Sequence, residues 1–386
     1  MLCTRKQQLS RAACPGSLVA PKWAVFLDNT SYSDRVSDTK VNQTDVSVEN
    51  SEPILSVVIC TYNPDEKLLK RALLAVAEQY IPSDSTIECV IVDNNSATPV
   101  AGLACVRAFL ERCGWARVVI EPRQGLTNAR IAGIASTRAS VICFVDDDNE
   151  LAKGYFASAL RILAERECIA VLGPGKVVVE YLEPVSEWFA HTFSHHFQER
   201  DASRLAYGSA GATWMDFYPP GSGMIVRRNA VEQYRQAFLA GRLFVLDREG
   251  INLSSGGDTQ IVWEATKMGL AAGISPELQL THIVPASRSN LRYIKRLCFG
   301  TSSSYLPALV NSFPSEKEKW LPSIPSNRRI IVDAVTIIVR HILRLKFDIL
   351  PIALASFLGS LVGLLRASGS SERGWIYRWV EFLELK

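Results

Sequence analysis

The chain has 386 residues, of which 48% are hydrophobic and 21% are charged, enough to bury the core of one large or two medium domains. The net charge of +3 gives no electrostatic reason to expect a nucleic-acid partner. None of the nine cysteines forms a Cys-x-x-Cys pair, so zinc and redox motifs lack support. Cys60, Cys89 and Cys143 stand in apolar, strand-like runs, where a reduced thiol behaves as a small hydrophobic side chain, so we expect a reducing, cytosolic compartment.

The first 53 residues predict a poorly ordered segment. Residues 28–53 are rich in Ser, Thr, Asn and Asp. The stretch before them has basic residues but no apolar run of the length that a signal peptide needs. We expect the folded part of the chain to begin at residue 54.

From Leu55 onward, short β-branched runs alternate with amphipathic segments. The first amphipathic segment has Asn63 as a candidate helix cap and Pro64 at its first turn. This rhythm predicts an α/β fold with a doubly wound, mostly parallel sheet. The expected strands are 55–61, 87–93, 116–121, 141–146 and 169–174, and the expected helices are 63–79, 99–113, 127–137 and 155–166.

Polar residues follow three of these strands, where such sheets bind their ligands. Three consecutive acids, Asp146 to Asp148, end the fourth strand. They predict either a solvated acidic turn or a site for a hard cation shared with a phosphate. Their position on the same edge as the other polar residues favours the cation. Those other residues are Thr61, Tyr62, Asn63 and Asp93.

Glycine-rich phosphate loops are absent from the places where they would be needed. No Gly-x-Gly-x-x-Gly follows the first strand, and no Gly-x-x-x-x-Gly-Lys-Ser/Thr occurs. A metal ion on carboxylates is the obvious substitute for such a loop in holding a diphosphate.

Five motifs, VVICTYNP, VIVDNNS, QGLTNARIAGI, FVDDDNE and SGGDTQI, stand in the order and spacing of family 2 glycosyltransferases with the GT-A fold. The resemblance covers about Leu55 to Arg296. It implies a GT-A-type domain at 54–300, with a nucleotide-sugar-binding half at 54–174 and an acceptor half at 175–300. A helical C-terminal extension at 301–386 would follow and associate with a membrane.

The resemblance also implies roles for individual residues. Mg2+ or Mn2+ would be the cofactor, on Asp146, Asp148 and His282, although a buried core histidine is the alternative for His282. A nucleotide-sugar, with a UDP-sugar as the first expectation, would contact Thr61, Tyr62, Asn63, Asp93, Arg130, Asp146 and Asp147. For Arg130 the alternative is a surface arginine on a helix.

The acceptor side is expected around a glycine loop that ends in Arg-Arg, with Gly221, Ser222 and Gly223 allowing close backbone approach. A plain turn is the alternative. Asp258 is the candidate general base, and a helix N-cap is its alternative. The family shows an acid before this aspartate, whereas this chain has Gly257 there.

Further basic and histidine residues lie in the second half. His191 and His195 have a spacing that suits metal, but no third ligand is near in sequence, so a surface turn is favoured. A basic cluster is expected to neutralise a diphosphate, on the donor or on a lipid-linked acceptor. It consists of Arg288, Arg292, Lys295 and Arg296.

The tail predicts contact with a membrane. Residues 328–347 have the pattern of a basic amphipathic helix, and 349–365 is an apolar run that contains Gly359 and Gly363. The run is near the short limit for a membrane span, and a helix folded onto the catalytic domain is the alternative. We expect a location at the cytoplasmic face of a membrane, peripheral or with one short span.

The sequence as a whole predicts a metal-dependent inverting glycosyltransferase that adds one sugar to a saccharide or lipid-linked acceptor, in polysaccharide or glycolipid biosynthesis. The Gln-x-x-Arg-Trp signature of processive synthases is absent. Two alternatives stay open, a nucleotidyltransferase and a non-catalytic membrane-associated partner that binds nucleotide-sugar.

Overall fold

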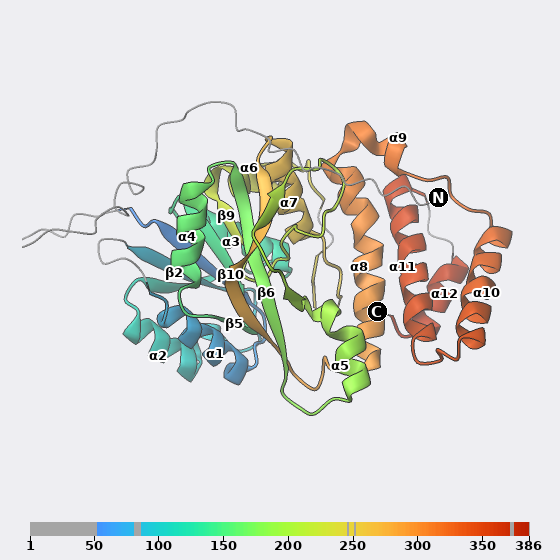
Figure 1. Ribbon diagram of the computed structural model, residues 1–386, viewed down its shortest axis with the longest axis horizontal. Coiled ribbons are helices and arrows are strands. Elements are labelled where there is room, and N and C mark those ends of the chain that lie inside the picture. The colour runs from blue at the N-terminus through green and yellow to red at the C-terminus, as the bar shows by residue number, and fades with distance from the viewer. Residues whose placement is uncertain (1–51, 81–85, 245–246, 251, 371–373, 386) are drawn as a thin grey trace, which may run out of the picture.

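The computed structural model describes residues 52–80, 86–244, 247–250, 252–370 and 374–385. The predicted N-terminal segment 1–53 lies outside these residues except for its last two. The described chain forms a sheet domain followed by a group of C-terminal helices (Figure 1).

A ten-stranded sheet is the centre of the domain, with the main strand order β3-β2-β1-β4-β9-β6-β10-β5. The short β9 (Ile225–Arg227) is antiparallel to both β4 and β6, so those two strands run in the same direction. The prediction of a mostly parallel α/β sheet is confirmed. The six parallel strands are β1 (Leu55–Thr61), β2 (Ile87–Asp93), β3 (Ala116–Ile120), β4 (Val141–Asp146), β6 (Ile169–Tyr181) and β10 (Ala271–Val284).

Helices cover both faces of the sheet because successive strand residues point to opposite sides. Val57 and Ile59 of β1 join one apolar core, and Val58 joins the other. The first core is closed by α1 (Glu66–Ala77), α2 (Ala104–Arg112) and α4 (Tyr155–Glu165). The second is closed by α3 (Leu126–Ala135), α6 (Arg228–Leu239) and α7 (Gly257–Lys267). The doubly wound arrangement follows.

Among the element boundaries that differ from the prediction, the start of α1 and the end of β6 bear on the site. Helix α1 begins at Glu66, because the side chain of Asp65 accepts a hydrogen bond from the backbone of Lys67 and so caps it. The expected cap, Asn63, has a left-handed backbone with φ 46°, so that assignment is wrong. Strand β6 continues past the expected end at residue 174, so the boundary between the two predicted halves falls inside a strand.

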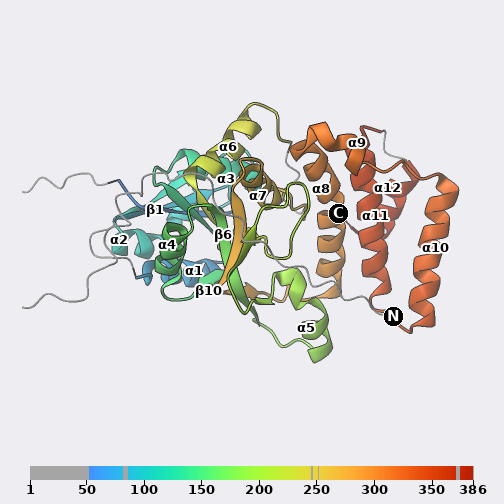
Figure 2. The ribbon, with the colours of Figure 1, turned by 45° about the horizontal axis from the view of Figure 1, so that its top comes forward.

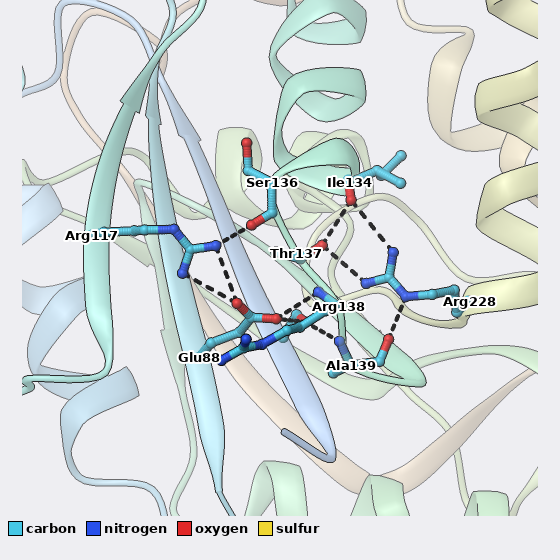
Figure 3. A network of polar contacts seen from close by, with 9 residues as sticks. Glu88, Arg117, Ile134, Ser136, Thr137, Arg138, Ala139 and Arg228 are labelled. Carbon is cyan, nitrogen blue, oxygen red and sulfur yellow. Dashed lines mark hydrogen bonds and ion pairs between the residues drawn. The ribbon is translucent and has the colours of Figure 1, made fainter. Parts of the chain in front are cut away.

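A buried acid ties the first three strands together at the end opposite the polar edge. Glu88 of β2 is 5% exposed and accepts hydrogen bonds from Ser56 Oγ at 2.8 Å and from Arg138 N at 2.7 Å. Arg117 of β3 pairs with it at 3.2 Å (Figure 3). Burial alone would raise the pKa of Glu88, but these donors outweigh burial and the pKa lies below its ordinary value.

The two arginines that end the glycine loop also serve the fold. Arg227 donates to the backbone oxygens of Ile169 at 2.8 Å and Leu163 at 2.6 Å. Arg228 donates to the backbone oxygen of Ala139, next to the Glu88 network (Figure 3). Since Arg227 pairs with Val141 at the start of β4, both arginines lie at the far end from the acids. The arginines therefore lie away from the sheet edge at which the acceptor side is expected, and the expectation for Gly221, Ser222 and Gly223 stays a prediction.

The C-terminal helices stack outward from the sheet domain, with α8 nearest the sheet and α10 outermost in both views (Figures 1 and 2). Glycines bring α11 against α8, since a Cβ at Gly359 would lie 2.5 Å from the oxygen of Phe299, and one at Gly363 would lie 3.0 Å from that of Ser303. The long members are α8 (Leu291–Ser312), α10 (Asn327–Leu343), α11 (Leu350–Ser368) and α12 (Gly374–Phe382).

Candidate active site

The predicted polar residues come together at one edge of the sheet. Thr61 pairs with Asp93 across β1 and β2, and Cys60 pairs with Asp146 across β1 and β4. The carboxyl ends of three neighbouring strands therefore lie side by side, as the sequence predicted.

Each of the three consecutive acids has a different partner. Asp146 accepts a hydrogen bond from Ser222 Oγ at 2.6 Å, and Asp147 accepts one from the Thr61 hydroxyl. Asp148 accepts from the guanidinium of Arg288. Hydroxyls and a cation from distant segments therefore satisfy the three carboxyl groups separately.

A short ladder places a histidine beside the last acid. Strand β5 (Asn149–Leu151) pairs with β10 so that His282 is opposite Asn149. His282 Nε2 lies 3.7 Å from Asp148 Oδ2, and its Nδ1 lies 2.9 Å from the backbone oxygen of Phe197. The histidine thus has contacts on both ring nitrogens and lies at the acid cluster.

The charges in this cluster shift one another. Burial would raise the pKa of Asp148, but His282 and Arg288 outweigh burial and hold it well below the ordinary value. Burial would lower the pKa of His282, and Asp148 outweighs that effect and raises it. Burial and the neighbouring charge of Asp148 raise the pKa of Asp147 to about 7.

The predicted metal ligands fit a hard cation by type, since Asp146 and Asp148 offer carboxylate oxygens and His282 an imidazole. Their arrangement in the structure does not form a metal site. Within the described ranges, no group of three or more histidine, cysteine or acidic side chains is disposed to hold a metal ion. The carboxylate of Asp148 accepts a hydrogen bond from Arg288 instead, and that of Asp146 accepts one from Ser222.

The glycine loop joins the acids to the candidate base. Gly221 N donates to Asp258 Oδ2 at 3.1 Å, while Ser222 of the same loop donates to Asp146. Gly223 has a left-handed φ of 67°, and a Cβ there would meet Tyr155 Oη at 2.6 Å. The loop is therefore packed between the two acids, and it is more than a plain turn.

Asp258 lies in the first turn of α7, whose N-cap is Gly256. The alternative of an N-cap is therefore wrong. Its Oδ1 accepts from the backbone of Thr259 at 2.9 Å, and its Oδ2 faces the glycine loop. Asp258 thus lies at the acid edge, where a general base would be needed.

Arg130 is buried, so the alternative of a surface arginine is wrong. Its Nη1 lies 3.3 Å from Asp247 Oδ2, and the two side chains are 6% and 5% exposed. Burial opposes the charge on Arg130, but Asp247, Asp258 and Asp146 outweigh it and raise its pKa. The guanidinium therefore stays positive among three carboxylates.

Two of the residues that are expected to contact the nucleotide-sugar, Asp93 and Asn63, accept hydrogen bonds from the protein's own backbone. Asp93 is 3% exposed, and its carboxylate accepts from the backbones of Ser96 and Val100, both at 2.9 Å. Asn63 Oδ1 accepts from Ala97 N at 2.8 Å. Tyr62 is 41% exposed. Asp93 and Asn63 thus order the loop after β2, and their role toward a nucleotide stays a prediction.

The predicted basic cluster does not converge. Arg288 contacts Asp148, whereas Arg292 pairs with Glu384 at 3.1 Å and is 72% exposed. Only part of the cluster therefore belongs to the site.

His191 lines a separate cavity with Trp188 and with C-terminal residues near Ile349.

Asp247 is the functional candidate that the sequence analysis missed. It lies in the loop between α6 and α7, two residues before Glu249, and no motif or periodicity surrounds it. Only the fold brings it to Arg130.

Several proteins that are similar to this chain in sequence carry glycosyltransferase names. The family model for Glycosyl transferase family 2 matches residues 56–235. N-acetylgalactosaminyltransferase 6 of Drosophila melanogaster is 26% identical over 51% of this chain and 27% of its own length. The probable glycosyltransferase YdaM of Bacillus subtilis is 25% identical over 47% and 42%. The chain thus spans less than half of either protein. The succinoglycan biosynthesis protein ExoM of Rhizobium meliloti is 22% identical over 69% and 78%.

Solved structures show only distant likeness. The mannosyltransferase PcManGT of Pyrobaculum calidifontis, in complex with GDP-Man and Mn2+, superposes with a TM-score of 0.46 at 16% identity, over 87% of this chain and 85% of that one. S. aureus TarS 1-349 gives 0.40 at 14% identity, over 83% and 93%. The family assignment rests on the sequence match, in which residues 56–235, a little under half of the chain, form a Glycosyl transferase family 2 domain.

Proposed function

We propose that this protein is an inverting glycosyltransferase that moves one sugar from a nucleotide-sugar to a hydroxyl group of an acceptor. The observation that carries this proposal is the loop 221–223, which binds Asp146 through Ser222 and Asp258 through Gly221. A donor-side acid and a candidate base thus face one short segment. The name of ExoM, a succinoglycan biosynthesis protein, supports a role in polysaccharide or glycolipid biosynthesis.

The chemistry needs a base, a leaving group and positive charge. Asp258 would take the proton of the acceptor hydroxyl while that oxygen forms a bond to the anomeric carbon. The bond from this carbon to the nucleoside diphosphate breaks at the same time, and positive charge grows on the sugar ring. Attack on the face opposite the leaving group inverts the anomeric carbon.

Two arginines, the buried Arg130 and the partly exposed Arg288, would stabilise the negative groups. Arg130 stands near Asp258, and Arg288 stands at Asp148, where the leaving diphosphate would gain charge. Mg2+ or Mn2+, when bound, would be held by Asp146, Asp148 and His282 and would add positive charge to the diphosphate. Arg288 would then have to release Asp148.

The test is release of nucleoside diphosphate by the purified chain. It is incubated with a panel of UDP- and GDP-sugars and Mn2+, with and without EDTA, and with a membrane extract as the source of acceptor. We expect release from one donor, lost in Asp148→Asn and Asp258→Asn. Asp201→Asn, at an exposed acid on β7 (Arg200–Asp201), is the matched control.

The outcomes separate the alternatives. Release that survives Asp258→Asn would overturn the assignment of the base. No release from any donor, even with the extract, would overturn the transferase proposal, and UDP binding that persists would then favour the non-catalytic partner.

We also propose that the C-terminal extension attaches the enzyme peripherally to a membrane, which would bring it to a lipid-linked acceptor. Helix α10 supports this, because it exposes apolar side chains beside Arg340 and Arg344. Among the described residues, α11 is long and apolar enough to span a membrane, but half of its most apolar window is buried. The exposed apolar residues are Ile331, Val332, Val335, Val339, Ile342 and Leu343.

A further inference from the structure

The missing acid before Asp258 leaves a gap that another residue fills. A Cβ at Gly257 would lie 2.4 Å from Asp247 Oδ2 and 3.0 Å from Arg130 Nη1. Gly257 is not among the residues with positive φ, so its backbone would accept a side chain. The obstacle is the carboxylate of Asp247, which already occupies the space beside position 257.

Asp247 is held firmly in that space. Its Oδ2 accepts from Thr127 Oγ1 at 3.1 Å and pairs with Arg130 Nη1, and its Oδ1 accepts from the backbone of Arg248 at 3.0 Å. Both partners of the ion pair are almost fully buried. Removing one member of such a pair leaves an uncompensated charge inside the protein.

The other end of the same guanidinium points toward the base. A Cβ at Gly221 would lie 2.8 Å from Arg130 Nη2 and 3.2 Å from Asp258 Oδ2. Arg130 therefore reaches from Asp247 to the loop that binds Asp258. Without the charge of Asp247, the guanidinium would be free to pair with Asp258 and to use the oxygen that a base needs.

We propose that Asp247 supplies, from a separate loop, the carboxylate that position 257 lacks, and that it positions Arg130 beside Asp258. The catalytic part of this inference rests on the proposed function. The carboxylate thus comes from another part of the sequence but lies at the same place in the fold, beside position 257.

Moving the carboxylate back tests the inference. Asp247→Ala removes the charge, and Gly257→Asp alone places a second acid against the first. We expect each single variant to lower the melting temperature. The double variant Asp247→Ala/Gly257→Asp restores one acid beside Arg130, and we expect it to melt well above either single variant.

A second double variant, Asp247→Ala/Gly257→Ala, is the matched control. It fills the space without a charge, and we expect it to melt like Asp247→Ala. Equal rescue by both double variants would mean that only packing matters, and it would overturn the proposal. The melting temperature can be measured without a nucleotide-sugar donor, so these variants test the placement of the carboxylate by itself. Failure of the wild-type chain to release nucleoside diphosphate would count against the proposed function and not against this placement.

Turnover then tests positioning. With the nucleotide-sugar that the wild-type chain hydrolyses, we expect kcat to fall on the order of tenfold in Asp247→Ala with a smaller change in KM. The double variant with Gly257→Asp should recover most of that loss. An unchanged kcat in Asp247→Ala would show that Asp247 is only structural, and restored melting with kcat still at the level of Asp247→Ala would show that an acid at position 257 does not take over the role of Asp247.

Discussion

The guanidinium of Arg288 donates directly to the carboxylate of Asp148, which lies 140 positions earlier in the chain. Asp148 is buried, and His282 lies on the same oxygen. A buried carboxylate needs a partner of opposite charge, and this chain provides one from its own sequence. The acid that family resemblance assigns to a metal is thus already paired with a cation, so Arg288 and a divalent ion would compete for it.

Arg288→Gln should therefore strengthen the binding of Mn2+ in the absence of nucleotide. Loss of the competing cation leaves Asp148 free, and we expect the dissociation constant to fall on the order of tenfold, which corresponds to about 1.4 kcal/mol. Titration calorimetry, or the electron paramagnetic resonance signal of free Mn2+, measures this without a donor. Turnover should fall, because the diphosphate loses a positive partner.

Arg292→Gln is the control for this experiment, since Arg292 is exposed and pairs with Glu384. It should leave the affinity for Mn2+ unchanged. If Arg288→Gln binds Mn2+ no better than the wild-type chain, competition at Asp148 is refuted.

Asp258→Asn should lower kcat by a factor on the order of 10²–10⁴, the usual contribution of a general base. The amide keeps the shape of the side chain, and it can still accept the hydrogen bond from Gly221 N. Binding of UDP should therefore stay close to the wild-type value. Parallel loss of UDP binding would assign Asp258 to the donor site instead.

Gly221→Ala should lower turnover while the protein stays folded. The added methyl group would lie 2.8 Å from Arg130 Nη2 and 3.2 Å from Asp258, so it would push the two apart. Gly102→Ala is the control, because nothing lies within 4 Å of a Cβ there. Circular dichroism checks that each variant is folded, and steady-state kinetics measures its turnover. Equal activity in the two variants would show that the loop tolerates a side chain.

Glu88→Gln should destabilise the fold by about 2 kcal/mol, because Ser56, Arg138 and Arg117 lose a charged acceptor. The pKa of Glu88 is lowered in the folded state, so its stabilising charge is fully present above the ordinary value of 4.5 and is lost as the pH falls through the folded value. The gap between the two proteins should therefore shrink in acid.

Urea unfolding of both proteins at about pH 7 and about pH 3.5 measures that gap. Glu111→Gln on the exposed side of α2 is the control and should have little effect at either pH. A gap that stays constant with pH would mean that the network around Glu88 does not depend on its charge.

The sequence predicted the parts of the fold that depend on local pattern. Strands β1, β2 and β4 match their predicted bounds, because a buried parallel strand is a continuous apolar run that ends in a polar residue. The acids at the sheet edge follow from the same pattern. Local pattern failed at Asn63, where the competing cap Asp65 is only two residues away.

Contacts between distant segments could not be predicted from the sequence. Nothing near Asp247 indicates that it faces position 257, because the approach is set by how the loop after α6 crosses α3 and α7. The partners of the three acids were likewise hidden, since Thr61, Ser222 and Arg288 come from three separate loops or strand ends. Pairing across the sheet edge is a property of the tertiary fold.

Helix α10 should bind vesicles that contain anionic lipid. Its exposed Val335 and Val339 lie one turn apart and beside Arg340, so apolar insertion and attraction to lipid charge act on the same face. Val335→Asp/Val339→Asp should weaken binding to phosphatidylglycerol vesicles on the order of tenfold in a sedimentation assay. Leu239→Asp, at an exposed position on α6, should change nothing.

Binding by the wild-type chain should also fall with added salt, since the lipid charge is screened. Vesicle binding that is insensitive to both salt and the α10 substitutions would move the attachment to α11 and favour a membrane span.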